Sequence, residues 1–182
     1  MLKSLRLRHI LSFRDAEIEL GPLNVLIGPN GSGKSNLIEI FDLLRYLPRD
    51  FQEFARISGG PQDWIWKGEP VEGESADVGR IETVLDNPVK NGTDSALLKH
   101  TIDISATGPY FRLNAERLDD ESSPEDSGRS QTYFKVDGGV GSLTKRRKSR
   151  TNGPVPSPEI SEISPDNTQP GQSIFRERRD PD

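Results

Sequence analysis

The sequence predicts an α/β fold in which a helix packs on a sheet with a large antiparallel part, and three observations support this prediction. A glycine-rich segment separates a short apolar run, 23–27, from a stretch with helical periodicity, 37–47. Polar and apolar residues alternate over 2–20, which is typical of half-exposed antiparallel strands. Short strand-like stretches separated by turn residues fill 76–147.

The first elements are two strands within residues 2–20, where Leu5 and Leu7 alternate with arginines. The apolar run 23–27 is typical of a strand buried on both faces of a sheet. A helix is predicted after it from apolar residues at helical spacing, and Pro48 is expected to end this helix. The apolar residues are Leu37, Ile40, Phe41, Leu44 and Leu47.

A second helix is predicted at 50–58, because Asp50 and Glu53 form a capping pair and Gly59-Gly60-Pro61 ends the segment. The strands that follow are predicted from β-type runs separated by turn pairs such as Asn91-Gly92. We expect these strands at 78–85, 97–106, 110–118, 132–136 and 140–144.

The organisation predicted from these elements has three parts. Residues 1–147 form one lobe, 148–172 form a loop or disordered segment rich in Pro and Ser, and 173–182 begin a further element. The 182 residues include no cysteine, which excludes disulfides and cysteine metal sites. The net charge of −5 argues against a polycation that coats nucleic acid. No apolar run could span a bilayer and no signal peptide is visible, so we expect no membrane partner and a cytoplasmic location.

The most specific motif is Gly-Pro-Asn-Gly-Ser-Gly-Lys-Ser at 28–35, which matches the Walker A or P-loop pattern G-x-x-x-x-G-K-[ST]. The glycines let the backbone turn so that its N–H groups face phosphate oxygens. Lys34 supplies positive charge for the outer phosphates, and the Ser35 hydroxyl can bind Mg²⁺. The helix that follows adds the partial positive charge of its N-terminus.

Together with this motif, Leu2-Lys3-Ser4-Leu5-Arg6-Leu7, Ser12-Phe13-Arg14 and residues 23–39 resemble the ABC-type ATPase heads of the RecF/SMC-like group. This group includes the AAA-labelled ATPases of phage-defence systems and the OLD proteins. The resemblance implies a P-loop NTPase lobe of ABC-ATPase type, with a mixed sheet and an antiparallel β-subdomain. It also implies that this chain is the N-terminal part of an incomplete head.

The same resemblance implies ATP and Mg²⁺ as cofactors, with Ser35 as the Mg²⁺ ligand and Lys34 in a catalytic role. It implies DNA as a partner, a role in DNA repair or phage defence, and assembly into a homodimer or with a second ATPase head. The nucleotide-binding residues that it implies are Gly28, Pro29, Asn30, Gly31, Ser32, Gly33, Lys34, Ser35 and Asn36. Arg14 could approach the nucleotide, but we interpret it as a solvated arginine.

Two elements that ATP hydrolysis requires are not visible. The nearest match to a Walker B strand is 83–86, but no acidic residue follows Asp86, and Asn87-Pro88 predicts a turn. The segment 57–62 resembles the ABC signature, but Pro61 interrupts it, and we interpret it as a Gly-rich exit from a helix. ATP hydrolysis is therefore expected only if missing elements complete the site.

Other candidate sites have ordinary structural interpretations. The basic cluster 145–150 could contact nucleic acid but is interpreted as a solvated strand end. Trp64 and Trp66 could stack on adenine but are expected in the core, and His100 is expected to be a strand residue. The acidic residues over 119–126 are expected to be solvated rather than metal-binding.

Two alternative functions remain at this point. The chain could be a non-catalytic fragment that binds a nucleotide or a partner without turnover, which the absent Walker B strand favours. It could also be another P-loop enzyme, such as a kinase, although the strands predicted over 76–147 look antiparallel rather than parallel. A GTPase-like switch is disfavoured because the sequence has no Asn-Lys-x-Asp motif.

Overall fold

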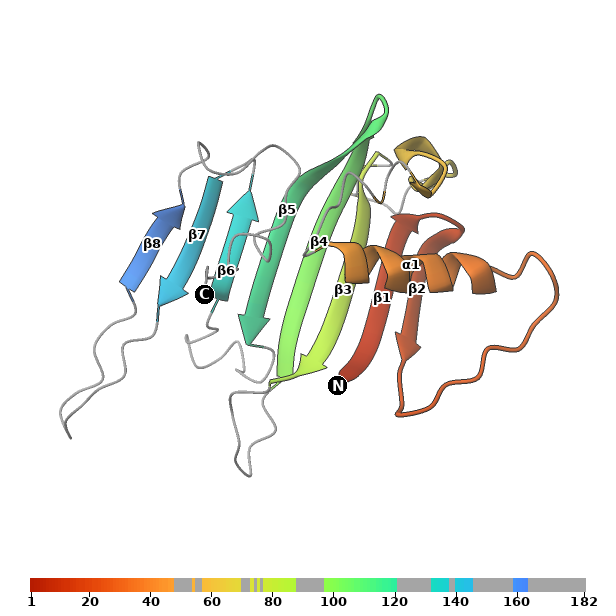
Figure 1. The fold of residues 1–182 in the computed structure, drawn as a ribbon, viewed down its shortest axis with the longest axis horizontal. Helices are drawn as coiled ribbons and strands as arrows, with labels where there is room; N and C mark the ends of the chain where they lie inside the picture. Colours follow the sequence, from red (N-terminus) through yellow and green to blue (C-terminus); the bar gives the residue numbers. More distant parts are fainter. Residues whose placement is uncertain are drawn as a thin grey trace.

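The computed structural model combines one long helix with a single eight-stranded sheet (Figure 1). It describes residues 1–47, 54, 57–69, 73, 75, 77–87, 97–120, 132–137, 140–145 and 159–163. The helix is α1 (Lys34–Tyr46), and a short 3₁₀ helix, η1, covers Pro61–Asp63. The strands are β1 (Leu2–Ile10), β2 (Phe13–Glu19), β3 (Gly79–Asp86), β4 (Leu97–Thr107), β5 (Tyr110–Asp120), β6 (Thr132–Asp137), β7 (Val140–Lys145) and β8 (Glu159–Ile163).

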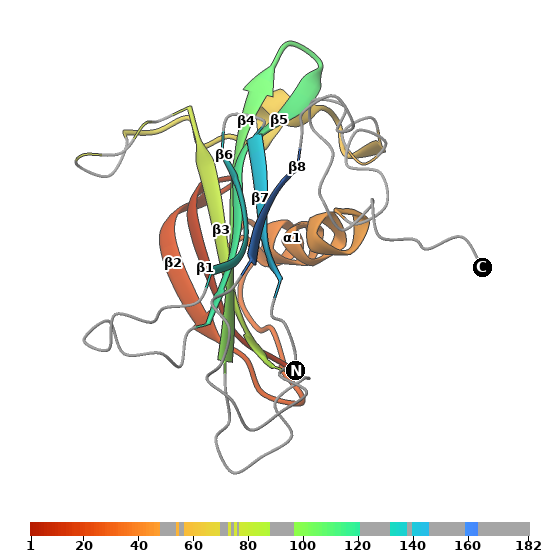
Figure 2. The same ribbon diagram turned by 90° about the vertical axis from the view of Figure 1, so that its left-hand side faces the viewer.

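The sheet has the order β2-β1-β3-β4-β5-β6-β7-β8, and every neighbouring pair is antiparallel. The helix α1 crosses one face of this sheet (Figure 2). The expected α/β architecture with an antiparallel sheet is therefore confirmed, and so are the strands predicted at 2–20 and from 78 to 144. No helix in the described part of the chain is long and apolar enough to cross a membrane.

One part of the chain differs from the sequence-based expectations in a smaller way. The strand β8 lies inside the segment 148–172, for which no regular structure was expected, and it pairs with β7. In the helix predicted at 50–58, Phe54 and Ile57 are helical, and the other residues of that helix before Ile57 lie outside the described residues. The rest of 148–172 and the whole of 173–182 also lie outside them.

The prediction of a buried strand at 23–27 is wrong. These residues form no strand, and Leu23, Val25 and Ile27 are 85%, 73% and 91% exposed. A strand needs a neighbour that accepts and donates its backbone hydrogen bonds, and a run that is apolar on both faces also needs covering layers. In the described sheet this run pairs with no strand, not even with the edge strand β2, and local sequence alone does not hold it in a β conformation.

This exposed apolar run leads to a prediction about self-association. Several large apolar side chains side by side on an unpaired segment favour intermolecular strand pairing. Val25→Asp should therefore lower concentration-dependent association, measured by sedimentation velocity, and leave the melting temperature unchanged. The control is Ile57→Asp, which puts the same charge on another exposed isoleucine. Equal effects of the two variants would show that net charge, and not this run, controls association.

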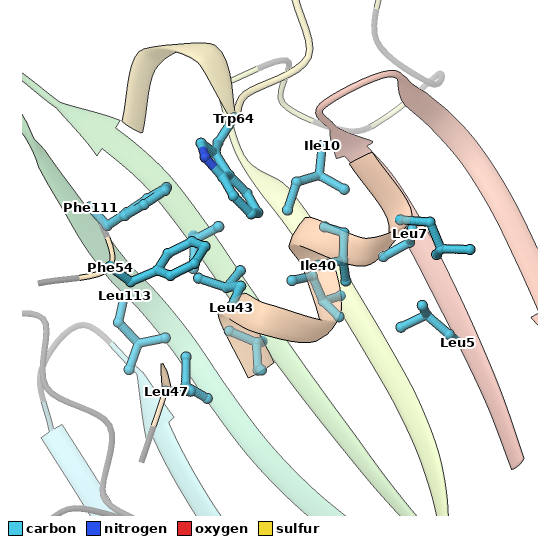
Figure 3. Packing of buried hydrophobic residues seen from close by; sticks show 14 residues of the cluster. Leu5, Leu7, Ile10, Ile40, Leu43, Leu47, Phe54, Trp64, Phe111 and Leu113 are labelled. Carbon is cyan, nitrogen blue, oxygen red and sulfur yellow. The ribbon is translucent and has the colours of Figure 1, made fainter. Parts of the chain in front are cut away.

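The core lies between α1 and the face of the sheet that it covers (Figure 3). The helix contributes Leu37, Ile40 and Leu43, because residues three and four apart share one face of a helix. Alternate residues of the central strands meet them from the sheet. These residues are Leu5, Leu7, Ile81, Ile102, Ile104, Phe111 and Leu113.

Aromatic rings extend this core toward η1. Phe54 packs edge-on against Trp64 with ring centroids 5.1 Å apart, and Trp64 packs in the same way against Phe111 at 5.8 Å. Trp64 is almost completely buried. The expectation that this tryptophan belongs to the core is confirmed, and these ring contacts join Phe54 and Trp64 to Phe111 of the sheet.

The opposite face of the sheet carries charged side chains in pairs. The guanidinium of Arg6 donates two hydrogen bonds to Asp15, at 3.1 and 3.0 Å, and Arg8 lies 3.6 Å from the same carboxylate. The bond to Arg6 lowers the pKa of Asp15 below its usual range. Because the folded pKa is depressed, the pair stabilises the fold above the unfolded pKa and loses this effect as the pH falls through the folded pKa.

Asp15→Asn tests this pH dependence. Solvent screens the pair, so the variant should lose only about 0.5 kcal/mol of unfolding free energy near neutral pH. The difference from the wild type should vanish in acid, where Asp15 is protonated and resembles asparagine. Urea unfolding at several pH values measures both quantities, and a difference that persists in acid would contradict the assignment.

Candidate phosphate-binding site

The glycine-rich loop 28–33 lies at the N-terminal end of α1, beyond the β2 edge of the sheet. After β2 the chain swings away from the sheet and returns at the start of the helix (Figure 1). A tight turn begins this excursion, because Gly21 and Asn24 exchange two hydrogen bonds of 3.0 Å. The loop is therefore held by the helix on one side and reaches solvent on the other.

The backbone of the loop turns at two glycines in the left-handed region. Gly31 has φ of 82° and Gly33 has φ of 88°, values that other residues rarely adopt. Gly33 is the N-cap of α1, and its carbonyl accepts the first helical hydrogen bond, from the amide of Leu37 at 2.9 Å. The amides of Lys34, Ser35 and Asn36 therefore have no partner within the helix, and the first turn contains no acidic residue.

The ammonium group of Lys34 closes over the loop. Its Nζ donates hydrogen bonds to the carbonyl oxygens of Gly28 at 2.8 Å and Pro29 at 2.6 Å, and to Ser32 Oγ at 3.2 Å. No ion pair joins a carboxylate to residues 28–36 in the described part of the chain. The loop thus gathers one positive charge and several backbone donors, which is the chemistry that binds an anion.

The remaining residues of the motif lie around this charge. Ser35 is exposed in the first turn of α1, so its hydroxyl is open to a ligand. A Cβ added to Gly28 would lie 2.9 Å from Ser32 Oγ, so a larger residue there would require the Ser32 side chain to move. A hydroxyl for a hard cation and an ammonium for phosphate oxygens fit ATP with Mg²⁺ chemically.

A turn from the sheet forms one wall of the site, which the spacing of the sequence did not indicate. Asn36 Nδ2 donates a hydrogen bond of 2.8 Å to Ser12 Oγ in the β1–β2 turn. A Cβ added to Gly33 would lie 3.0 Å from the same oxygen and 3.6 Å from Phe13 Cζ. The resemblance to known ATPase heads already included Ser12-Phe13-Arg14, but this contact depends on tertiary structure. Arg14 is exposed in β2.

The motifs interpreted as structural lie away from this loop. Asp86, at the end of the strand that approaches a Walker B pattern, binds the N-terminal ammonium at 3.1 Å and Lys3 at 3.3 Å. The bond to the N-terminal ammonium lowers the pKa of this carboxyl. Asp86 lies beside the start of β1, where Leu2 pairs with Leu85, and thus at the opposite end of β1 from the β1–β2 turn. The segment 57–62 is a helix exit, with Gly59 and Gly60 at positive φ, as predicted.

The other candidates also have structural partners. His100 lies in β4 and its Nε2 is 2.9 Å from Oε1 of the fully buried Glu116. Asp119 binds Arg117 at 2.6 Å, so this part of the acidic segment is paired on the sheet. Trp66 is partly buried, with its backbone amide bound to His9 O at 3.0 Å.

Most of the basic cluster 145–150 and the acidic residues from 121 onward lie outside the described residues. No group of three or more potential metal ligands occurs among the described residues.

Comparison with known proteins finds a family model that matches more than half of the chain, and relatives that match shorter parts of it. A family model described as "AAA domain, putative AbiEii toxin, Type IV TA system" matches residues 23–136. An OLD nuclease of Thermus scotoductus is 39% identical over 65 residues, which is 36% of this chain and 12% of the relative. The DNA replication and repair protein RecF of a Synechococcus species is 47% identical over 47 residues, which is 25% of this chain and 12% of that protein.

The match to these relatives is thus partial. The chain spans about an eighth of the length of the curated relatives that it matches. A solved structure from a study of ATP-driven dimerization and DNA stimulated activation of SMC ATPases superposes with a TM-score of 0.39 and 18% identity. That superposition covers 62% of this chain and 69% of the SMC chain, and its TM-score is too low to establish a common fold.

Proposed function

This chain belongs to the family described as AAA domain, putative AbiEii toxin, Type IV TA system, and from this premise we propose that residues 28–36 bind ATP together with Mg²⁺. The observation that carries the proposal is the set of donors at the start of α1. The Lys34 ammonium, the left-handed glycines and the unpartnered amides lie together, and no carboxylate among the described residues forms an ion pair with Lys34.

In this proposal each group has one task. The amides between Asn30 and Ser35 donate to the β-phosphate, and Gly31 and Gly33 provide the turns that this requires. Lys34 exchanges the carbonyls of Gly28 and Pro29 for oxygens of the β- and γ-phosphates. The Ser35 hydroxyl holds Mg²⁺, which would neutralise charge on these phosphates when bound.

The wider role that we propose is that of the N-terminal lobe of an ATPase that acts on DNA, in repair or in phage defence. Two relatives are a DNA replication and repair protein and a nuclease, which supports a link to DNA. We further propose that two such heads, as a homodimer or with a second ATPase head, form the working unit. ATP hydrolysis then requires a Walker B carboxylate and a signature segment that residues 1–182 do not supply.

A non-catalytic nucleotide-binding role is the second candidate, and one observation favours it. The carboxylate that comes nearest to a Walker B pattern, Asp86, is bound to the N-terminal ammonium and Lys3 instead of facing the loop. A kinase-like enzyme is disfavoured, because all described strand pairs are antiparallel, whereas such enzymes keep a mainly parallel sheet.

Isothermal titration calorimetry with ATP and with GTP, each with Mg²⁺, tests the proposed function. We expect ATP to bind in the presence of Mg²⁺ and to bind more weakly after EDTA has removed the Mg²⁺. GTP should bind more weakly than ATP. A parallel assay of phosphate release separates an ATPase from a passive binder. Absence of ATP binding at millimolar concentration would overturn the proposal, and equal turnover by the wild type and Lys34→Ala would assign any activity to a contaminant.

A further inference from the structure

The backbone at the end of β1 and in the β1–β2 turn, residues 9–12, is unusual. His9 and Leu11 have φ of 49° and 50°, and they are the non-glycine residues with positive φ among the described residues. This conformation brings Cβ close to the following carbonyl, so it is unfavourable for a bulky residue such as leucine. Strain of this kind persists where the surrounding structure enforces it, and it gathers at functional sites.

The surrounding contacts show what enforces this turn. The amide of Leu11 donates to Trp64 O at 2.6 Å, the amide of Trp66 donates to His9 O at 3.0 Å, and Ile10 forms a β-bridge with Ile65. The side chains of His9 and Ile10 are buried. The segment 64–66 at the end of η1 therefore holds the strained turn in place through backbone hydrogen bonds.

The β1–β2 turn places the side chains of Ser12 and Phe13 next to the start of α1. Ser12 Oγ accepts the 2.8 Å hydrogen bond from Asn36 Nδ2, and the Phe13 ring lies against Gly33. Gly33 is the N-cap in the left-handed region, so its position determines where the following amides point. A movement of the turn must therefore be followed by a movement of these amides.

We propose that Ser12 and Phe13 are positioning residues, which hold Gly33 and Asn36 so that the amides at the start of α1 are in place before a polyphosphate binds. The inference rests on the proposed function, that residues 28–36 bind a nucleoside triphosphate. Without the turn, the ligand itself must order these amides, and the entropy that this costs weakens binding. Ser12 and Phe13 act through the loop and need no contact with the base.

A double-mutant cycle tests the inference. Ser12→Ala and Asn36→Ala should each weaken binding of Mg²⁺-ATP by about three- to tenfold, the effect of one lost hydrogen bond. The double variant should be no weaker than either single variant, because both remove the same bond. Ser12→Thr should restore binding, since it keeps the hydroxyl. The control is Ser105→Ala, which removes a similar Ser–Asn hydrogen bond, to Asn114 at 3.1 Å, elsewhere in the sheet.

Inorganic triphosphate as a second ligand identifies how the turn acts. If Ser12 acts through the amides, Ser12→Ala should weaken the binding of triphosphate and of ATP by the same factor. A loss seen with ATP alone, or additive effects of Ser12→Ala and Asn36→Ala, would overturn the inference.

Hydrogen exchange in the absence of any ligand separates this inference from the proposed function. The amide of Leu37, which donates the first helical hydrogen bond to Gly33 O, should exchange faster in Ser12→Ala than in the wild type. If the wild type binds neither ligand, the proposed function fails. Unchanged exchange overturns the positioning role on its own.

Discussion

Lys34→Ala is expected to weaken ATP binding about ten- to a hundredfold, because hydrogen bonds to a charged group contribute about 1.5–3 kcal/mol each. In the structure the ammonium spans Gly28, Pro29 and Ser32, so it is already placed over the loop. These partners are exposed and can hydrogen-bond to water when the ammonium is removed. The melting temperature should therefore stay close to that of the wild type.

Lys67→Ala is the matched control for this variant. It removes the same charge from an exposed lysine that pairs with Asp63 at 2.8 Å and has no contact with the loop. Calorimetric titration with Mg²⁺-ATP at constant ionic strength measures both variants. If Lys67→Ala weakened binding as much as Lys34→Ala, the loss would come from net charge, and the local role of Lys34 would be refuted.

The second large effect concerns stability. Ile40→Ala should lower the free energy of unfolding by about 2–5 kcal/mol, because it opens a cavity between α1 and the sheet where the side chain is fully buried. Ile38 is two residues earlier in the same helix and 54% exposed. Ile38→Ala removes the same atoms from the solvent side and should change stability by no more than about 0.5 kcal/mol.

Urea unfolding followed by circular dichroism measures both isoleucine variants. Both substitutions lie in the same helix, remove the same atoms and gain the same helix propensity of alanine. The difference between their losses of unfolding free energy therefore measures the effect of burial. Similar losses for the two variants would mean that α1 does not pack on the sheet through Ile40. A loss confined to Ile40→Ala would support the packing of α1 that places the P-loop beside the β1–β2 turn.

Elements whose signal lies within the element itself were predictable from the sequence. The alternation in β1 and β4 and the helical spacing of Leu37 and Ile40 reflect local geometry, so the strands and α1 could be placed to within a few residues. The composition of 148–172, with its many prolines and serines, concealed β8, which exists through its pairing with β7. Short strands of this kind have no clear local signature.

Features that depend on residues distant in sequence were not predictable. The run 23–27 has the composition of a buried strand, but the described sheet gives it no neighbour. The bond between Ser12 and Asn36 and the pairing of His100 with Glu116 depend on register and crossing geometry. The loop itself was identified from its motif, whereas the wall formed by the β1–β2 turn required the tertiary structure.

The order of strands has a consequence for how the molecule folds. From β3 to β8 each strand pairs with the next one along the chain. This part of the sheet can therefore form hairpin by hairpin, through contacts between residues that are near in sequence. The pairing of Leu7 with Ile81 is different, because it closes a long loop that contains the P-loop and α1. We therefore expect the docking of the first hairpin onto β3 to be slower than the formation of the hairpins from β3 to β8.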